Sequence, residues 1–265
     1  MIPKIIHYCW FGRNEKPKAV QKCIKSWKKH CPDYQIIEWN EDNYDISSAP
    51  LFVRQVFDAG KWGFIADYIR LEIIYTHGGI YLDTDVEAIQ SFDGLLKNSA
   101  FWGFEYDNQF INSGLGFGAE KGTPILLDLM DIYKSIPFIR ADGSYDLTPC
   151  TYRETKVFIA HGLRVDGTEQ TIDNSIHIYS SEYLCPCNWR NGEVKKTNKT
   201  ISIHWYNMSW KTKEEREKRK RKLRKLRIYR NFSGPIRIVK SLIGQRNFNK
   251  LKKVFGLDEK RHVDD

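Results

Sequence analysis

The stretch that decides the fold reads Asp67-Tyr-Ile-Arg70-Leu-Glu-Ile-Ile-Tyr-Thr-His-Gly78-Gly79-Ile-Tyr81-Leu-Asp83-Thr-Asp85. Apolar residues recur at helical spacing from position 64 to position 75, which predicts a helix with one buried stripe. The double glycine predicts the end of this helix, because glycine adopts a left-handed backbone without a steric penalty. The three residues after it are apolar and predict a short strand that runs directly into the two acids.

Strands and helices alternate on both sides of this stretch, which is typical of an α/β fold. We therefore expect a mostly parallel central sheet with helices packed on it. The expected strands are residues 4–9, 35–39, 80–82, 100–105, 111–118, 175–179 and 200–205, and the expected helices are 17–30, 64–75 and 122–134.

Asp83 and Asp85 follow the strand 80–82, at the edge where open α/β sheets bind ligands. Two carboxylates at this spacing suit Mg²⁺ or Mn²⁺, which prefer hard oxygen ligands. The alternative is a solvated acidic turn. Asp67 and Arg70 share one face of the preceding helix and form either a buried ion pair or a pair that binds phosphate and sugar.

A second polar group follows the last expected strand of this part of the chain. His204 is a candidate metal ligand there, and Ser209 and the indole N–H of Trp210 are candidate donors to a diphosphate. The alternative is an aromatic edge of the core.

The 265-residue chain has a net charge of +9, and this charge is unevenly distributed. Residues 211–265 hold 20 Lys+Arg and 7 Asp+Glu, a net charge of +13, which leaves residues 1–210 at −4. With this net negative charge, residues 1–210 are poorly suited to bind nucleic acid. We expect a catalytic domain over 1–210 and a basic amphipathic helical appendage over 211–265, which either lies on an anionic membrane or packs on the body.

No apolar run reaches the roughly 18 residues of a spanning helix, and the first residues lack the features of a signal peptide. We therefore expect a cytoplasmic protein, peripheral at the inner face of the cell membrane.

The stretch 67–85 closely resembles the D-x-x-R…G-G-x-Y-x-D-x-D signature of family 32 glycosyltransferases, the DXD sugar-binding transferases of capsule and mannan synthesis. This family is similar to the catalytic domains of large clostridial glucosylating toxins. The resemblance extends to the opening segment 2–12, to Trp39-Asn40 and to the segment 111–119, and it covers residues 2–210.

The resemblance implies a GT-A fold and a Mn²⁺- or Mg²⁺-dependent, retaining transfer of a hexose. The donor is expected to be UDP-galactose or UDP-glucose, and the acceptor a glycan, lipid-linked, in bacterial capsular or surface polysaccharide synthesis.

The resemblance also assigns roles to individual residues. Trp10 stacks on the base, and Asp85 binds the metal together with His204 or its rival Asn207. Asp83, Asp85 and Arg70 are the catalytic candidates. The candidates for donor binding are His7, Trp10, Asp67, Arg70, Tyr81, Asp83, Thr84, Asn112, Ser209 and Trp210.

The sequence leaves two alternatives to a glycosyltransferase. Residues 80–86 also resemble the start of haloacid-dehalogenase-type phosphatases, with Asp83 as nucleophile and Asp85 as general acid. That motif normally closes the first strand of the chain, whereas about 80 residues precede it here. A non-enzymatic nucleic-acid binder with a basic tail is the second alternative, and the acidic body argues against it.

Overall fold

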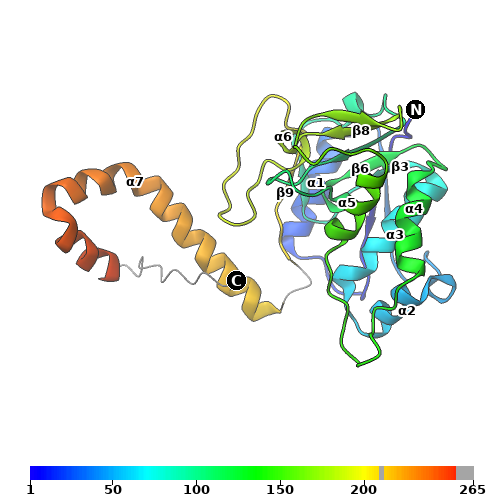
Figure 1. Cartoon of the computed structure of the whole chain (residues 1–265), viewed down its shortest axis with the longest axis horizontal. Coiled ribbons are helices and arrows are strands. Elements are labelled where there is room, and N and C mark those ends of the chain that lie inside the picture. Colours follow the sequence, from blue (N-terminus) through cyan, green and yellow to red (C-terminus); the bar gives the residue numbers. More distant parts are fainter. Residues whose placement is uncertain (209–211, 255–265) are drawn as a thin grey trace. The chain divides into compact units, whose positions relative to one another are not determined.

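The computed structural model describes residues 1–208 and 212–254 (Figure 1). The chain divides into two compact units. The first comprises residues 1–189 and 194–210, and the second comprises residues 190–193 and 211–265.

The first unit contains every described strand and six of the α-helices. Its helices are α1 (Lys18–His30), α2 (Leu51–Asp58), α3 (Trp62–His77), α4 (Ile125–Lys134), α5 (Cys150–Ala160) and α6 (Ser181–Leu184). Its strands are β1 (Ile5–Cys9), β2 (Gln35–Trp39), β3 (Gly79–Tyr81), β4 (Val86–Ala88), β5 (Ala100–Gly103), β6 (Phe117–Ala119), β7 (Gln170–Ile172), β8 (Ile176–Tyr179) and β9 (Ser202–His204). Three short 3₁₀ turns, η1 (Ile46–Ser48), η2 (Asp93–Leu95) and η3 (Ser113–Leu115), connect some of them.

Seven strands form the main sheet in the order β2-β1-β3-β6-β5-β8-β7. The predicted α/β class is confirmed, but the sheet is mixed rather than mostly parallel. β1 is parallel to β2 and β3, and β5 is parallel to β8, whereas β6 is antiparallel to both of its neighbours and β7 to β8. The chain between β5 and β6 holds only a 3₁₀ turn and no crossover helix, so β6 returns beside β5 in the opposite direction.

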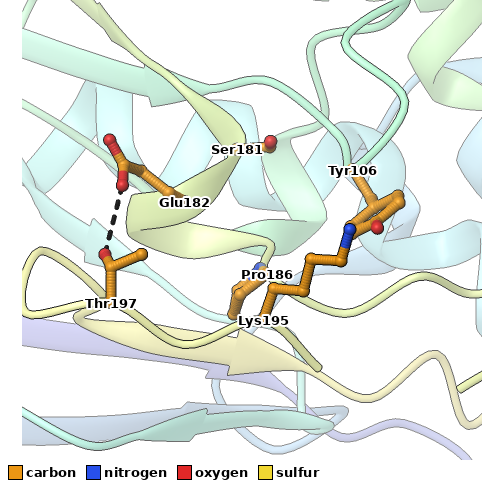
Figure 2. A pocket seen from close by; sticks show the side chains of 6 residues that line it. All are labelled: Tyr106, Ser181, Glu182, Pro186, Lys195 and Thr197. Carbon is orange, nitrogen blue, oxygen red and sulfur yellow. Dashed lines mark hydrogen bonds between the residues drawn. The ribbon is translucent and has the colours of Figure 1, made fainter. Parts of the chain in front are cut away.

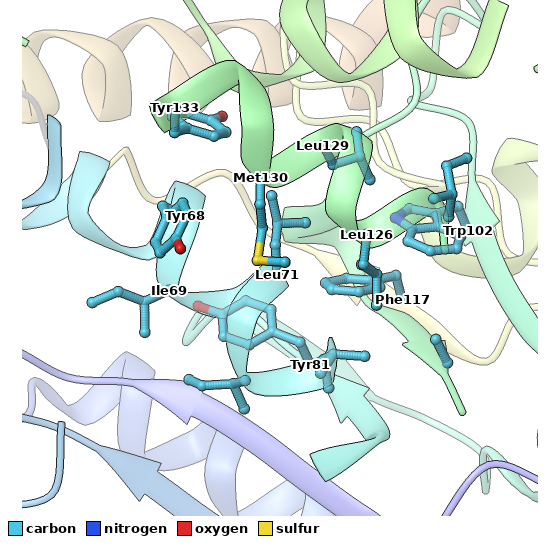
Figure 3. Close-up of a cluster of buried hydrophobic side chains, with 14 of the residues drawn as sticks. Tyr68, Ile69, Leu71, Tyr81, Trp102, Phe117, Leu126, Leu129, Met130 and Tyr133 are labelled. Carbon is cyan, nitrogen blue, oxygen red and sulfur yellow. The ribbon is translucent and has the colours of Figure 1, made fainter. Parts of the chain in front are cut away.

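Side chains of the main sheet enter two separate cores, one on each face, because successive residues of a strand point to opposite faces. Trp102 of β5 lies in the core under α2 to α5, and its neighbour Phe101 lies in the core that holds residues of α1. Figure 3 shows the first core, where α3 and α4 contribute most of the labelled side chains and the Trp102 and Phe117 rings stack with centroids 4.9 Å apart. This packing fixes α3 and β3, which carry Asp67, Arg70 and the acids after them.

The turn between α3 and β3 depends on its glycines. Gly78 has φ 68° and Gly79 has φ 107°, a region that other residues rarely adopt. A Cβ atom at Gly79 would lie 2.8 Å from the carbonyl oxygen of Ile5, so the double glycine also lets β3 approach β1.

A second sheet of two strands, β4 and β9, joins distant parts of the first unit. The strands are antiparallel, and Val86 pairs with His204. This sheet brings the end of the first unit back to the turn at residues 83–85.

The second unit contains helix α7 (Lys213–Val254), which is interrupted at Gly244 by a non-helical backbone with φ 76°. The helix confirms the expected helical character of the appendage. Within residues 1–208 and 212–254, the structure contains no helix with the length and apolar character needed to span a membrane.

Candidate functional site

Asp83 and Asp85 lie in a tight turn between β3 and β4. The amide of Val86 donates to the carbonyl oxygen of Asp83 at 3.0 Å, which closes the turn. Their side chains are 30% and 15% exposed, so both carboxylates reach the surface while their backbone is held by two sheets. The structure thus places the acids at the carboxyl edge of β3, as the sequence predicts.

The pairing of β4 with β9 brings His204 onto Asp85. His204 Nε2 lies 3.0 Å from Asp85 Oδ1, and the backbone amide of Asn207 donates to Asp85 Oδ2 at 2.7 Å. One ligand atom each from Asp83, Asp85 and His204 lies within 4.8 Å of the others. The other ring nitrogen, His204 Nδ1, is buried and has no hydrogen-bond partner among the described residues.

The electrostatics of the two acids differ. Burial raises the pKa of Asp83, and the nearby charge of Arg70 only partly opposes this effect. Burial acts on Asp85 in the same direction, but its contacts with His204 and the Asn207 amide outweigh burial and lower its pKa. Burial likewise opposes the charge of His204, and Asp85 outweighs it, so the pKa of His204 is raised.

Two carboxylates and an imidazole that converge at a partly exposed edge fit a divalent cation. Hard oxygen ligands suit Mg²⁺ and Mn²⁺, and imidazole is a common further ligand of transition metals. One ligand atom of each residue lies within 4.8 Å of the others, close enough for the three side chains to share one ion. The role of Asn207 as the alternative ligand stays a prediction, and the structure gives its backbone, rather than its side chain, a contact with Asp85.

Arg70 lies behind Asp83 in a buried cluster of charges. Its Nη2 donates to Asp67 Oδ1 at 2.9 Å and to Glu154 Oε1 at 3.2 Å, and its Nη1 lies 3.7 Å from Asp83 Oδ1. The side chains of Arg70 and Asp67 are only 2% and 8% exposed. The buried ion pair is therefore present, and a direct contact of either residue with a donor stays a prediction.

Asn112 and Gly114 form a turn directly beside Asp83. Asn112 Oδ1 accepts from the amide of Gly114 at 2.6 Å, and Asn112 Nδ2 donates to Glu105 Oε1 at 2.8 Å. A Cβ atom at Gly114 would lie 2.4 Å from Asp83 Oδ2, so only glycine lets this turn approach the carboxylate. Asn112 lies beside the site with its amide occupied within the protein, and its contact with a donor stays a prediction.

The structure corrects two predicted donor contacts. His7 is fully buried, and its ring nitrogens contact the carbonyl oxygen of Gly78 and Nε1 of Trp39, each at 3.0 Å. Tyr81 is 1% exposed and packs in the first core. Both side chains lack a surface for a ligand, so they support the turn at Gly78 and the strand β3 instead.

Trp10 and Thr84 are half-buried and keep part of their surface. Trp10 Nε1 donates to the carbonyl oxygen of Asn14 at 2.7 Å, and Lys16 Nζ lies 5.7 Å from the ring centroid. Base stacking by Trp10 stays a prediction. Ser209 and Trp210, the predicted diphosphate donors, lie outside the described residues.

Sequence reasoning missed Glu154 and Glu105. Glu154 lies on α5, in a stretch rich in polar residues that has no clear apolar periodicity, and it is nevertheless fully buried. Glu105 follows β5 and is tied to Asn112. The partners of Glu154 are 84 and 41 residues away in the sequence, so no local pattern indicates its burial, whereas Asn112 is only seven residues from Glu105.

A separate pocket of about 310 Å³ lies in the first unit (Figure 2). Thr197 Oγ1 donates to Glu182 Oε2 across one side of it, at 3.1 Å. Its lining shares no residue with the group around Asp83 and consists of Tyr106, Ser181, Glu182, Pro186, Lys195 and Thr197.

Comparisons with known proteins agree with this site. Residues 17–102 match the model of the glycosyltransferase sugar-binding region containing a DXD motif. An inositol phosphoceramide mannosyltransferase 3 of Schizosaccharomyces pombe is 34% identical over 133 residues, which cover 49% of this chain and 36% of that protein. An uncharacterized glycosyltransferase, L373, of Acanthamoeba polyphaga mimivirus is 27% identical over 201 residues, or 72% of this chain and 76% of that protein.

Among solved structures, the PaToxG glycosyltransferase superimposes on 60% of this chain and 68% of its own, with 19% identity and a TM-score of 0.46. A glycosyltransferase involved in glycosylation of the major capsid of PBCV-1 covers 82% of this chain and 98% of its own, with 12% identity and a TM-score of 0.44.

An acid-rich turn at the ligand-binding edge of an α/β sheet, with a histidine brought to it by a second sheet, is an arrangement that could hold a metal ion. Residues 17–102, which include these acids, match the sugar-binding region of glycosyltransferases with a DXD motif. Here that motif is Asp83-Thr84-Asp85. The chain spans about a third of the length of the S. pombe relative that it matches.

Proposed function

We propose that this protein transfers a hexose from a nucleotide sugar to a glycan acceptor, with a divalent cation and with retention at the anomeric carbon. The observation that carries the proposal is the convergence of Asp83, Asp85 and His204 at the edge of β3. The matched DXD region supports the class of reaction. UDP-glucose and UDP-galactose are the proposed donors, and the mannosyltransferase named among the relatives adds nucleotide-linked mannose as a second candidate.

Each part of the site has a distinct task in this proposal. Asp85 and His204 would hold Mn²⁺ or Mg²⁺, with Asp83 beside them. The bound cation supplies a Lewis acid that neutralises charge on the departing diphosphate. Asp83, whose carboxylate faces the Gly114 turn, orients hydroxyl groups of the donor, and the exposed part of Trp10 covers the base.

The acceptor and the place of action belong to the same proposal. From Arg216 to Arg230, helix α7 carries 10 Lys and Arg and one Glu, and Ile228 and Tyr229 are 46% and 40% exposed. Basic side chains beside exposed apolar ones suit an anionic membrane surface, where each basic residue contributes about 1 kcal/mol. We propose a lipid-linked glycan acceptor at the inner face of a bacterial membrane, in the synthesis of a capsular or surface polysaccharide.

A donor panel tests the proposal. Purified protein with Mn²⁺ is incubated with UDP-glucose, UDP-galactose, their N-acetyl forms and GDP-mannose, and release of nucleoside diphosphate is measured. We expect release from one donor, and none with Asp85→Asn. Release of phosphate from simple phosphomonoesters, with none from any nucleotide sugar, would support the phosphatase alternative instead.

A further inference from the structure

Glu154 connects three parts of the site that the sequence keeps apart. It lies on α5 and is fully buried, and each of its carboxylate oxygens has its own task. Oε1 accepts from Arg70 Nη2 at 3.2 Å. Oε2 accepts from both the amide and the hydroxyl of Ser113, at 3.0 and 2.9 Å. Glu154 thereby joins α3 to the turn that lies against Asp83.

The position of Arg70 relative to Asp83 is the feature that Glu154 controls. Arg70 Nη1 and Asp83 Oδ1 are 3.7 Å apart, beyond the usual length of a hydrogen bond. Arg70 Nη2 is held on the other side by Asp67 and Glu154. The guanidinium is therefore attracted to Asp83 but anchored away from it, and the Asp83 carboxylate remains 30% exposed.

We propose that Glu154 is a positioning residue that keeps Asp83 available to the cation and the donor, by holding Arg70 back and by fixing the Ser113–Gly114 turn. This inference rests on the proposed function, since it concerns the ligands of that same site. Glu154 itself touches neither ligand in this proposal.

A carboxylate is required at this position because every partner of Glu154 is a donor. Arg70 presents an N–H group to one oxygen, and Ser113 presents an N–H and an O–H group to the other. A glutamine side chain has the same shape but offers one oxygen and one NH₂ group. In Glu154→Gln, one of the two partners would face another donor, and Arg70 would lose the attraction of a buried charge and move toward Asp83.

The neighbouring Thr155 provides a matched control. Its Oγ1 accepts from the amide of Ile111 at 2.9 Å and donates to the carbonyl oxygen of Thr151, so it anchors the same segment from the same helix without a hydrogen bond to Arg70. Thr155→Val removes this acceptor without a change of shape. This variant measures the effect of losing the hydrogen bond between Thr155 and Ile111, separately from any effect on Arg70 and Asp83.

The experiment measures binding of Mn²⁺ with UDP by calorimetry, donor hydrolysis and melting temperature for the wild type, Glu154→Gln and Thr155→Val. We expect Glu154→Gln to weaken Mn²⁺–UDP binding and to lower kcat/KM by about 10- to 100-fold, the usual range for residues that orient ligands from behind. Thr155→Val should change binding and kcat/KM by less than about 3-fold. This holds even when its melting temperature falls as far as that of Glu154→Gln.

Each outcome decides the proposal. Equal losses in the two variants, or wild-type binding by Glu154→Gln, would overturn the positioning role and leave the proposed function in place. A wild-type protein that binds no Mn²⁺–UDP and hydrolyses no nucleotide sugar would overturn both. If Glu154→Gln does not fold, Glu154→Asp decides, because it keeps the charge but withdraws the oxygens by one methylene. Its affinity should then fall further than that of Thr155→Val.

Discussion

His204 Nε2 lies 3.0 Å from Asp85 Oδ1, and the antiparallel pairing of β4 with β9 is what puts them together. The contact joins the DXD turn to the end of the first unit. The proposed metal site at this turn therefore depends on β9, a strand far along the sequence that carries His204.

The first prediction concerns the DXD acids. Asp85→Asn should abolish sugar transfer and chelation by EDTA should do the same to the wild type, because Asp85 is the proposed cation ligand. Asp83→Asn should be nearly as damaging through loss of donor orientation. Nucleoside diphosphate release measures both. Asp42→Asn, which removes only a surface ion pair with Arg13, serves as the control. Full activity of either acid variant in the presence of EDTA would show that the turn is a solvated acidic loop and does not bind a metal.

The second prediction concerns the base. Base stacking on an aromatic ring contributes roughly 1–3 kcal/mol, so Trp10→Ala should raise the donor KM by about 5- to 150-fold. The melting temperature should fall little, since the ring is only half-buried. Steady-state kinetics and thermal unfolding distinguish the two effects. Global unfolding of the variant would show that Trp10 is a core residue.

The third prediction concerns stereochemistry. Retention means that a UDP-α-sugar yields an α-linked product. The anomeric coupling in the NMR spectrum of the purified product measures this directly. A β-linked product from the same donor would contradict the retaining mechanism.

The fourth prediction concerns pH. His161 contacts Asp173 through Nδ1 and Asp128 through Nε2, the latter at 2.9 Å. Burial lowers the pKa of His161, but the two carboxylates outweigh it and raise the pKa above 6.5. A raised pKa in the folded state stabilises the protein fully below the unfolded pKa, and this contribution is lost as pH rises through the folded pKa.

His161→Gln should therefore lower the melting temperature most at about pH 5.5 and least at about pH 9, well above the ordinary pKa of histidine. Thermal unfolding across this range provides the measurement. His30→Gln, at the end of α1, is the matched control. A destabilisation by His161→Gln that does not change with pH would show that its charge makes no contribution.

The fifth prediction concerns the basic helix. The protein should co-sediment with anionic liposomes, not with neutral ones, and less at high salt, because screening weakens surface charge interactions. Removal of residues 211–265 should abolish this binding and leave donor hydrolysis intact. Replacing Arg221, Lys222, Arg224 and Lys225 with Ser in the full chain tests the charge alone. Equal sedimentation of the full-length and truncated proteins would end the membrane proposal.

Local patterns in the sequence predict the elements around the site well. The helix expected over 64–75 is α3, and the strand expected over 80–82 is β3, shifted by one residue. Both have strong signals, namely a continuous apolar stripe and a double glycine. The expected strand 111–118 contains the 3₁₀ turn η3 and becomes β6 only from Phe117.

The features that sequence patterns miss depend on contacts between distant residues. Helix α5 was not predicted, because its surface is largely polar and few of its residues face the core. The short strand β4 is defined by its partner β9 rather than by its own three residues. The burial of Glu154 follows from Arg70 and Ser113, which no local spacing relates to it.

The pairing of β4 with β9 has a consequence for the protein during its synthesis. Among the described strands, β9 is the last to leave the ribosome, so a nascent chain that ends before it has the two acids but not their histidine partner. Under the proposed function, the cation site is therefore complete only after β9 has been synthesised.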